Sequence, residues 1–377
     1  MTRRRIVHPL AIRFLNRGAI QPQLKGRWGP HFQPPSPSSI FDPTPRDVPV
    51  PSPPPITASS RRLEMFYRHG NFTMAYATLQ PGMKYFEGHG GYLAYDTSLG
   101  ITFVLGDPVA PQESYPGLIK SFIEKHPRSC FCQVSPQVAA ILSRLGWYVS
   151  QFGADMELDL PHYNFDGPQK GKFRQAARKV EREGYTIVER SSGEIDRVSL
   201  ESLSASWRAT KRVKREARFL VRPMSYEDEP DVRKFYLLDP TGEVVSFVAF
   251  DPLCERGETI GYSPAIKRRS SAAPTGAEEA ITKFAVERFR TEGLRVLRLG
   301  LLPFYQVEDS EFPESVRLKK VFQWLYRTGD RWIYSFRGHA DFKHRYRGTL
   351  SKVYFGTFTR WRNAINLIAL MRLCRFV

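Results

Sequence analysis

Apolar residues recur along the chain in two ways, as short strand-like runs and at helical spacing. Between residues 91 and 146 these patterns predict three strands and two helices. The predicted elements are a strand at 91–95, a strand at 101–105, a helix over 115–125, a strand at 130–134 and a helix over 136–145 that Gly146 closes. A strand, a helix and a strand in close succession predict parallel strands joined by a crossover helix.

A second region repeats this order. Residues 244–250 alternate and are β-branched or aromatic, which predicts a strand, and 296–301 predicts another. Between them, residues 276–292 carry apolar side chains at helical spacing, and Gly293 closes this helix. We therefore expect an α/β or α+β fold of two similar lobes, with helices covering mixed sheets.

The beginning of the chain has a different composition. Residues 33–60 are crowded with Pro and Ser, which favours an extended linker, so the folded part is predicted to begin near Arg61. Residues 1–17 are basic, contain no acid and are amphipathic in places. They fit either a targeting or lipid-surface helix or a frayed basic tail.

The chain has 377 residues, 41% hydrophobic and 25% charged, as in ordinary globular proteins. Lys and Arg number 56 against 38 Asp and Glu, giving a net charge of +18. This excess favours a polyanionic partner, either nucleic acid or acidic lipid headgroups. The four cysteines form no disulfide framework or paired zinc motif, and no apolar window is long enough to span a membrane.

Two basic clusters lie on predicted helical or loop segments. The first follows Phe165-Asp166-Gly167 and precedes Glu183-Gly184-Tyr185, and it includes Lys172, Arg174 and Arg178. The second follows Trp207 and includes Lys211 and Arg215. Such clusters are either solvated surface or contacts to nucleic-acid phosphates, which need cations without sequence readout.

Acidic residues begin the helix predicted at 276–292. The segment Pro274-Thr275-Gly276-Ala277-Glu278-Glu279 follows Arg268 and precedes Leu299-Gly300-Leu301-Leu302-Pro303. Gly276 lets the backbone turn into the helix, and the helix dipole stabilises carboxylates in the first turn. Glu279 is therefore either structural or part of a site.

The segment Phe342-Lys343-His344-Arg345-Tyr346-Arg347 alternates and precedes Tyr354. As a strand it would point Lys343 and Arg345 the same way, so that two cations could converge on an oxyanion or phosphate. The alternative is an exposed edge strand with protective charges.

Together with the turn Gly106-Asp107-Pro108, these motifs resemble, in the same order, the family of lysylphosphatidylglycerol synthetase C-terminal catalytic domains. Glu279 stands where that family has Asp, and Gly348, Leu350 and Val353 replace its Pro, Trp and Arg. The resemblance implies two tandem acetyltransferase-like lobes, expected here at 61–165 and 166–357. It also implies transfer of an aminoacyl group from aminoacyl-tRNA to an anionic membrane lipid such as phosphatidylglycerol.

The resemblance implies roles for particular residues. Glu279, Lys343 and Arg345 are expected to be catalytic. Substrate contacts are expected from Arg268, Gly276, Asp107 and Tyr354, and tRNA contacts from Lys172, Arg174, Arg178, Lys211 and Arg215. Because an ester is already activated, no metal or organic cofactor is expected. Coenzyme A is not expected either, since residues 268–273 lack the glycines of its pyrophosphate-binding turn.

Two alternatives remain open at this point: transfer to a different acceptor, and a non-catalytic relative that binds nucleic acid or membrane. The expected location is cytoplasmic and peripheral, at the inner face of the membrane. Residues 358–377 are predicted to form a basic amphipathic helix. This helix could insert into an anionic bilayer surface or pack on the second lobe.

Overall fold

The computed structural model describes residues 58–331, 334–359, 361 and 363–376. Helix α1 (Ala58–His69) begins close to the predicted start of the folded part at Arg61. The predictions for residues 1–57, a basic segment and a linker, lie outside the described residues.

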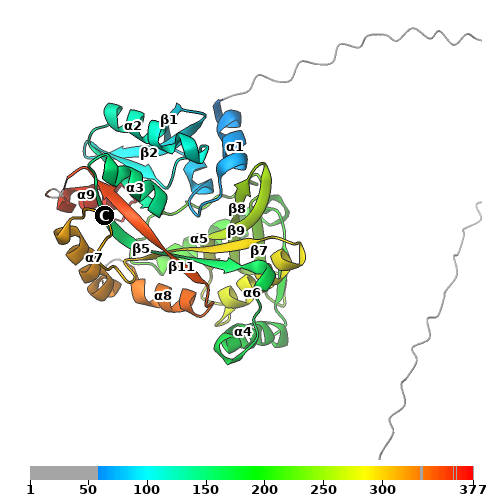
Figure 1. The fold of residues 1–377 in the computed structure, drawn as a ribbon. Coiled ribbons are helices and arrows are strands. Elements are labelled where there is room, and N and C mark those ends of the chain that lie inside the picture. The colour runs from blue at the N-terminus through cyan, green and yellow to red at the C-terminus, as the bar shows by residue number, and fades with distance from the viewer. Residues whose placement is uncertain (1–57, 332–333, 360, 362, 377) are drawn as a thin grey trace, which may run out of the picture. The chain divides into compact units, whose positions relative to one another are not determined.

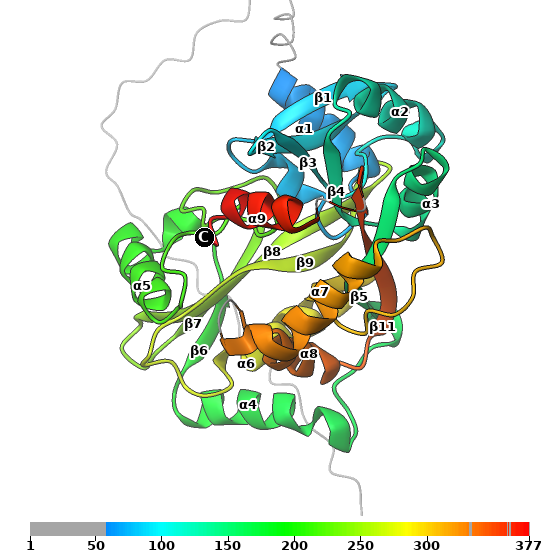
Figure 2. The same ribbon diagram turned by 90° about the vertical axis from the view of Figure 1, so that its left-hand side faces the viewer.

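In this part of the chain, 11 strands form one mixed sheet in the order β1-β2-β3-β4-β11-β5-β10-β9-β8-β7-β6 (Figures 1 and 2). The strands are β1 (Lys84–Gly88), β2 (Gly91–Ser98), β3 (Ile101–Leu105), β4 (Ser129–Val134), β5 (Tyr148–Asp159), β6 (Thr186–Glu189), β7 (Arg233–Leu238), β8 (Val244–Glu255), β9 (Glu258–Arg269), β10 (Val296–Pro303) and β11 (Thr349–Thr357). The fold class is therefore mixed α/β, as the sequence predicts.

Helices cover both faces of this sheet. After α1 they are α2 (Tyr115–Lys125), α3 (Pro136–Arg144), α4 (Gly171–Arg182), α5 (Arg197–Ala209), α6 (Ala277–Thr291), α7 (Val316–Thr328), α8 (Phe336–His344) and α9 (Asn363–Leu373). Short 3₁₀ turns join several of them, such as η5 (Ser192–Glu194).

Alternate residues of β3 and β4 are buried on opposite faces. Val104 and Phe131 pack with α2 and α3, whereas Phe103, Cys130 and Cys132 pack with α1 and α9. Because both faces are covered, these strands read as continuous apolar runs. This explains why their positions are predictable from the sequence.

The first predicted crossover is present, whereas the second starts from β9, a strand that the sequence does not predict, and not from the strand predicted at 244–250. Strands β3 and β4 pair in parallel and are joined through α2, and β9 and β10 pair in parallel and are joined through α6. Antiparallel pairs precede each crossover, β2 with β3 and β8 with β9. The two regions therefore repeat one order of strands and helices.

The two regions exchange strands near the middle of the sheet. Strand β11, late in the chain, pairs with both β4 and β5, and β5 also pairs with β10. The two predicted lobes therefore share one continuous sheet. The boundary between residues 165 and 166 stays a prediction.

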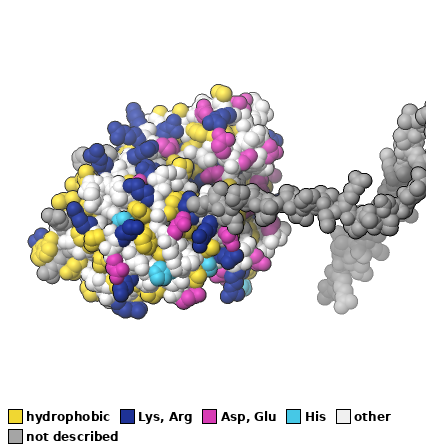
Figure 3. Space-filling model, turned by 90° about the horizontal axis from the view of Figure 1, so that it is seen from above, with side chains coloured by type: hydrophobic (Ala, Val, Ile, Leu, Met, Phe, Trp, Pro, Cys, Tyr) yellow, Lys and Arg dark blue, Asp and Glu magenta, His cyan; other side chains and the backbone are white. Residues whose placement is uncertain are grey.

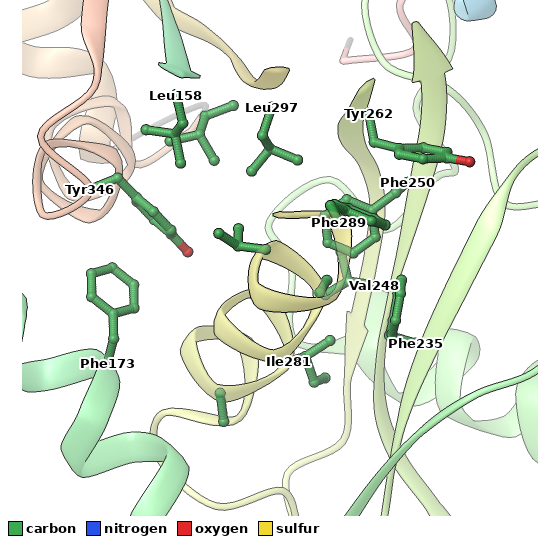
Figure 4. Close-up of a cluster of buried hydrophobic side chains, with 14 of the residues drawn as sticks. Leu158, Phe173, Phe235, Val248, Phe250, Tyr262, Ile281, Phe289, Leu297 and Tyr346 are labelled. Atoms are coloured by element: carbon green, nitrogen blue, oxygen red, sulfur yellow. The ribbon is translucent and has the colours of Figure 1, made fainter. Parts of the chain in front are cut away.

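Helix α6 is the centre of the second core. Figure 4 shows its Ile281 and Phe289 turned toward Val248 and Phe250 of β8. The ring of Phe289 stacks on Tyr262 with centroids 4.6 Å apart. These contacts bury the apolar stripe that predicts this helix.

The strand predicted at 342–347 is wrong. This segment is the end of α8, in which Phe336, Ala340 and Lys343 are buried on one side of the helix. Their spacing of four and three residues is helical, and the alternation of 342–346 resembles a strand only over its short length. Tyr346, just after α8, packs on Phe173 of α4 with ring centroids 4.4 Å apart.

The C-terminal helix forms as α9, with one side packed and the other exposed. Leu370 and Leu373 are buried in a core with residues of β2 and β3, so α9 packs chiefly on the first half of the sheet, and it also contacts α7 of the predicted second lobe. On its outer side Ile365 and Ile368 are 49% and 55% exposed. Among the described residues, no helix is long and apolar enough to cross a membrane.

Candidate functional site

The two strands of the second crossover pair over a very short distance. Strand β10 meets β9 only at Val296 with Gly261 and at Leu297 with Tyr262. A Cβ on Gly261 would lie 1.9 Å from the carbonyl oxygen of Val296, so only glycine permits this approach. Beyond Leu297 the pairing of β10 continues only with β5. We call the region where the β9–β10 pairing stops the β9–β10 junction.

Helix α6 starts beside this junction from a glycine. Gly276 has a φ of 92°, in the left-handed region, and precedes the first residue of the helix. A Cβ there would also lie 2.8 Å from the Cβ of Ala176 on α4. Both the turn and the close packing of α4 therefore need glycine, which gives Gly276 a structural role at the entrance to the helix.

The two acids of the first turn of α6 are each paired with a cation. Glu278 forms an ion pair with Lys267 of β9. Glu279 pairs with Arg345, whose Nη1 lies 3.1 Å from its Oε1. The structure therefore brings together Glu279 and Arg345, which lie 66 positions apart in the sequence.

Lys343 lies inside the protein, only 4% exposed. Its Nζ donates a hydrogen bond to the carbonyl oxygen of Leu301 on β10 at 2.8 Å. Burial, and then the nearby charge of Lys267, lowers the pKa of Lys343 to about 7, against the opposing effect of Asp155 and Glu278. A substantial fraction of this amine is therefore neutral at physiological pH.

Because Lys343 and Arg345 lie at the end of a helix, they do not point the same way. Side chains two positions apart on a helix point in directions that differ by about 200°. Lys343 points to β10, and Arg345 points to Glu279 on α6. The predicted convergence of the two cations on one group through strand alternation is therefore wrong.

A carboxylate from β5 completes the surroundings of Lys343. Asp155 accepts a hydrogen bond from the Thr73 hydroxyl, and its own backbone neighbour Met156 donates to it at 2.8 Å. Burial raises the pKa of Asp155, while Thr73 and the charge of Lys343 oppose that rise. A Cβ on Gly300 of β10 would lie 3.5 Å from the Lys343 Nζ, so the glycine leaves room for the amine.

His339 precedes Lys343 by one helical turn on α8. Burial, together with the charges of Lys343 and Lys267, holds the pKa of His339 well below its usual value. The imidazole is therefore neutral at pH 7.

The β9–β10 junction thus combines a buried amine of near-neutral pKa with a carboxylate–guanidinium pair at the start of a helix. A neutral amine can accept a proton, and a carboxylate can hold an ammonium group. No group of three or more His, Cys, Asp or Glu residues suited to a metal occurs in the described part of the chain.

Residues 64–356 match the family described as phosphatidylglycerol lysyltransferase, C-terminal. This match covers well over half of the chain. The chain belongs to this family.

Curated relatives carry corresponding names. The phosphatidylglycerol lysyltransferase of Bacillus subtilis (strain 168) is 25% identical over 250 residues, which cover 65% of this chain and 28% of that protein. The lysylphosphatidylglycerol biosynthesis bifunctional protein LysX of Nocardia farcinica is 26% identical over 126 residues, 32% of this chain and 11% of LysX. The chain therefore matches less than a third of the length of either protein.

Solved structures share the fold. The structure of L-PGS from Bacillus licheniformis has a TM-score of 0.70 and 20% identity, covering 83% of this chain and 95% of that one. The C-terminal domain of a putative lysylphosphatidylglycerol synthetase from Agrobacterium fabrum has a TM-score of 0.69 and 19% identity, covering 84% and 96%. The mixed sheet with exchanged central strands therefore belongs to a fold that other proteins share.

Not every residue expected from the family resemblance lies at the junction. Arg268 of β9 points to the opposite face of the sheet from Lys267, where its guanidinium lies 4.1 Å over the Trp207 ring and pairs with Glu216. It is buried, 5% exposed. Arg268 therefore braces the segment after α5 and does not join Glu279 in one pocket.

Asp107 and Tyr354 lie in the first half of the sheet. Asp107 accepts a hydrogen bond from the backbone N–H of Ser135, which caps α3, at 2.8 Å. Burial raises the pKa of Asp107 to about 6, opposed by the hydrogen bonds of Ser135 and the charge of Arg298. Tyr354 donates to the carboxylate of Glu311. These contacts indicate that both side chains support local structure.

The residues expected to contact tRNA fall into two separate places. Lys172 and Arg178 are exposed on α4, while Arg174 donates to the carbonyl oxygen of Gly167 at 2.8 Å and braces the start of that helix. Lys211 is exposed, with its ammonium 4.5 Å over the Trp207 ring, and Arg215 is exposed near α9. In Figures 1 and 2, α4 and α9 lie on distant parts of the protein.

The sequence does not identify four residues of the junction, namely Thr73, Asp155, Lys267 and His339. Asp155 has a possible signal, because it is a charged residue inside a strand whose neighbours Ala154 and Met156 are buried. A charge placed in such a strand needs a partner. The other three have no local signal, since their partners come from distant parts of the chain.

Proposed function

We propose that this protein transfers an aminoacyl group, lysyl or similar, from aminoacyl-tRNA to the headgroup hydroxyl of phosphatidylglycerol or a closely related lipid. The observation that carries the proposal is Lys343, a buried amine of pKa about 7 at the β9–β10 junction of a chain of this family. Such an amine is suited to moving a proton at neutral pH.

In the proposed reaction the lipid hydroxyl oxygen attacks the carbonyl carbon of the aminoacyl ester. Its proton passes to Nζ of neutral Lys343, and the carbonyl oxygen becomes an oxyanion. When that intermediate collapses, the bond to the ribose oxygen of the tRNA breaks, and this oxygen takes the proton back from Lys343. The amine ends neutral, so the protein needs no other proton source.

Asp155 and the carbonyl of Leu301 orient the Lys343 amine in this proposal. Leu301 accepts one of its hydrogen atoms at 2.8 Å, and the Asp155 carboxylate stabilises the ammonium form when it arises. The Glu279 carboxylate, at the start of α6, would hold the amino group of the aminoacyl substrate. Arg345 fixes that carboxylate in place and offers a cation to the lipid phosphate.

The exposed basic residues of α4 would contact the donor. Lys172 and Arg178 lie on the outer side of this helix, whose inner side packs Phe173 and Ala176 against α6. Phosphate contacts by such residues are electrostatic, so binding to tRNA should fall steeply with salt. The packing of α4 on α6 connects this surface to the residues of the junction.

The test is a transfer assay with purified protein, labelled lysyl-tRNA and phosphatidylglycerol vesicles, followed by mass spectrometry of the lipids. The proposal predicts a lysylated lipid that requires both substrates. The same assay with total charged tRNA and a lipid extract identifies a different amino acid or acceptor. If charged tRNA and lipid both bind but no lipid becomes aminoacylated, the protein is a non-catalytic relative and the proposal is wrong.

A further inference from the structure

A hollow of about 390 Å³ lies between the β2–β3 turn and α9, away from the β9–β10 junction. It is lined by Leu99, Arg215, Ile368, Arg372 and Arg375. Among these lining residues three are cations, two are apolar and none is acidic. Arg215, Arg372 and Arg375 are exposed, and none of their side chains forms an ion pair or a hydrogen bond with another described residue.

Apolar side chains surround these arginines on the outside of the protein. Leu99 is 51% exposed, Ile365 49% and Ile368 55%. The opposite side of α9 is occupied, since Leu370 and Leu373 are buried in the core. The exposed apolar residues are therefore not needed to hold α9 on the sheet.

Leu99 is an unusual residue for its position. The pairing of Ser98 with Ile101 leaves a two-residue turn of Leu99 and Gly100, with φ values of 50° and 71°. Turns of this kind favour Asn-Gly or Asp-Gly, because both residues need a left-handed backbone. A bulky apolar residue at the tip is unfavourable for the turn and for solvation. Its presence indicates that Leu99 contacts a partner outside the folded chain.

We propose that this surface, formed by the β2–β3 turn and the outer side of α9, docks on an anionic lipid bilayer. The three arginines would contact lipid phosphates, while Leu99, Ile365 and Ile368 would enter the boundary between headgroups and acyl chains. Nucleic acid would satisfy the arginines but would leave the aliphatic side chains without a partner, so the bilayer fits more of the surface. Arg215, expected from the sequence to contact tRNA, belongs to this surface.

Lys and Arg are frequent over much of the face seen in Figure 3, where acidic side chains gather more on the right-hand part. Near the hollow, the acid Asp96 of β2 is already paired with Arg218 at 2.8 Å and with Lys84 at 3.6 Å. The local field therefore stays positive and matches the charge of an anionic membrane. Docking of this surface on a bilayer would bring the protein to the lipid of the proposed function. The inference rests on that function only for the choice of phosphatidylglycerol as the anionic lipid.

The test uses the full chain and sedimentation with vesicles of phosphatidylcholine containing phosphatidylglycerol, in the absence of tRNA. Serine at Leu99, Ile365 and Ile368 should lower vesicle binding roughly tenfold or more, since apolar contact with the bilayer is lost. Glutamine at Arg215, Arg372 and Arg375 should lower it about fivefold for each charge, and binding to pure phosphatidylcholine should be weak throughout. The matched control is Val198→Ser on α5, because Val198 is 71% exposed away from α9, and this variant should bind vesicles as the unchanged protein does.

Two outcomes would overturn the inference. One is unchanged vesicle binding by the serine variant with a folded circular dichroism spectrum. The other is loss of tRNA binding, but not of vesicle binding, in the glutamine variant, which would make the surface an RNA contact. If the serine variant does not fold, Ile368→Ser alone replaces it. Transfer to short-chain, dispersed phosphatidylglycerol should continue in the serine variant, and its absence in the unchanged protein would count against the proposed function and not against docking.

Discussion

At the first crossover, β3 and β4 pair at four successive positions, from Thr102 with Ser129 to Leu105 with Cys132. At the second crossover, β9 and β10 pair at only two positions, although β9 has 12 residues and β10 has eight. The two crossovers share one topology. They differ in how far the parallel strands remain together.

The side chains around the two crossovers differ in the same way. Phe103, Cys130 and Cys132 are fully buried among other apolar groups at the β3–β4 crossover. Lys343 and Asp155 lie beside the β9–β10 junction, where β10 no longer pairs with β9. The first turn of α2 has no acid, whereas that of α6 has two.

A parallel crossover alone therefore does not make a functional site. Where the strands stay paired, backbone groups satisfy one another and apolar packing fills the remaining space. Where pairing stops, buried polar side chains from distant elements can meet, and their pKa values shift.

The largest effect is expected from Lys343→Met, which keeps the length of the side chain and removes the amine. Without the proton acceptor, the transfer rate should fall roughly 10²- to 10⁴-fold. The measurement is the single-turnover rate, with circular dichroism to verify folding. Lys234→Met is a matched control, because Lys234 is also buried, 3% exposed, but binds Ser192 and the Glu227 carbonyl away from the junction. An equal loss of transfer rate in both variants would contradict a role of Lys343 in proton transfer.

A smaller loss, roughly 10²-fold, is expected from Glu279→Gln, because the variant keeps the size of the side chain but loses its charge. Arg345→Gln should weaken the same contact, and the double variant should lose less than the product of the two single losses. Rates for all four proteins test this. Full activity in Glu279→Gln would leave the Glu279–Arg345 pair with a structural role only.

At the first crossover, Asp107→Asn should change stability and leave the rate almost unchanged. The folded pKa of Asp107 is about 6, above its ordinary value of 3.8, so the folded state binds more protons between these values. Stability from this group is therefore present at low pH and is lost as pH rises through about 6. The unchanged protein should gain stability relative to the variant on going from pH 7 to pH 4. Melting temperatures at several pH values measure this, and a parallel pH dependence in the two proteins would contradict it.

The smallest effect on function concerns the thiols. Burial raises the pKa of Cys130 to about 12 and that of Cys132 well above its usual value. Because the thiolate is the nucleophile, iodoacetamide at pH 8 should label neither thiol in the native protein and should leave the transfer rate unchanged. Mass spectrometry follows the labelling, with urea-unfolded protein as the positive control. Rapid native labelling would show that the first crossover opens.

Strands with both faces buried, such as β3, are predictable because a short apolar run ending in Gly106 and Pro108 has few other interpretations. The start of α6 is predictable from Gly276 and the acids that follow it. The sequence singles out Lys343 but gives no indication that it lies on a helix. Phe336 and Ala340, which show the helical spacing, lie before the segment whose alternation resembles a strand.

The other features of the fold and of the junction depend on tertiary structure. The partners of Lys343 come from β5, β9, β10 and α6, and no local pattern indicates that Asp155 and Lys267 lie near one amine. The exchange of β5 and β11 is likewise invisible in the sequence, because strand order is a property of the whole sheet. Burial of Lys343, and hence its pKa, follows only from this assembly.

The pKa of Lys343 in the working protein is the central claim, and the pH dependence of the single-turnover transfer rate tests it most directly. The rate should rise with pH through a midpoint of about 7, as the amine becomes neutral. Lys267→Met removes a neighbouring positive charge and should move the midpoint to higher pH, whereas Glu278→Gln removes a negative charge and should move it lower. A rate that is flat between pH 6 and pH 8, or a midpoint that neither variant moves, would contradict the account.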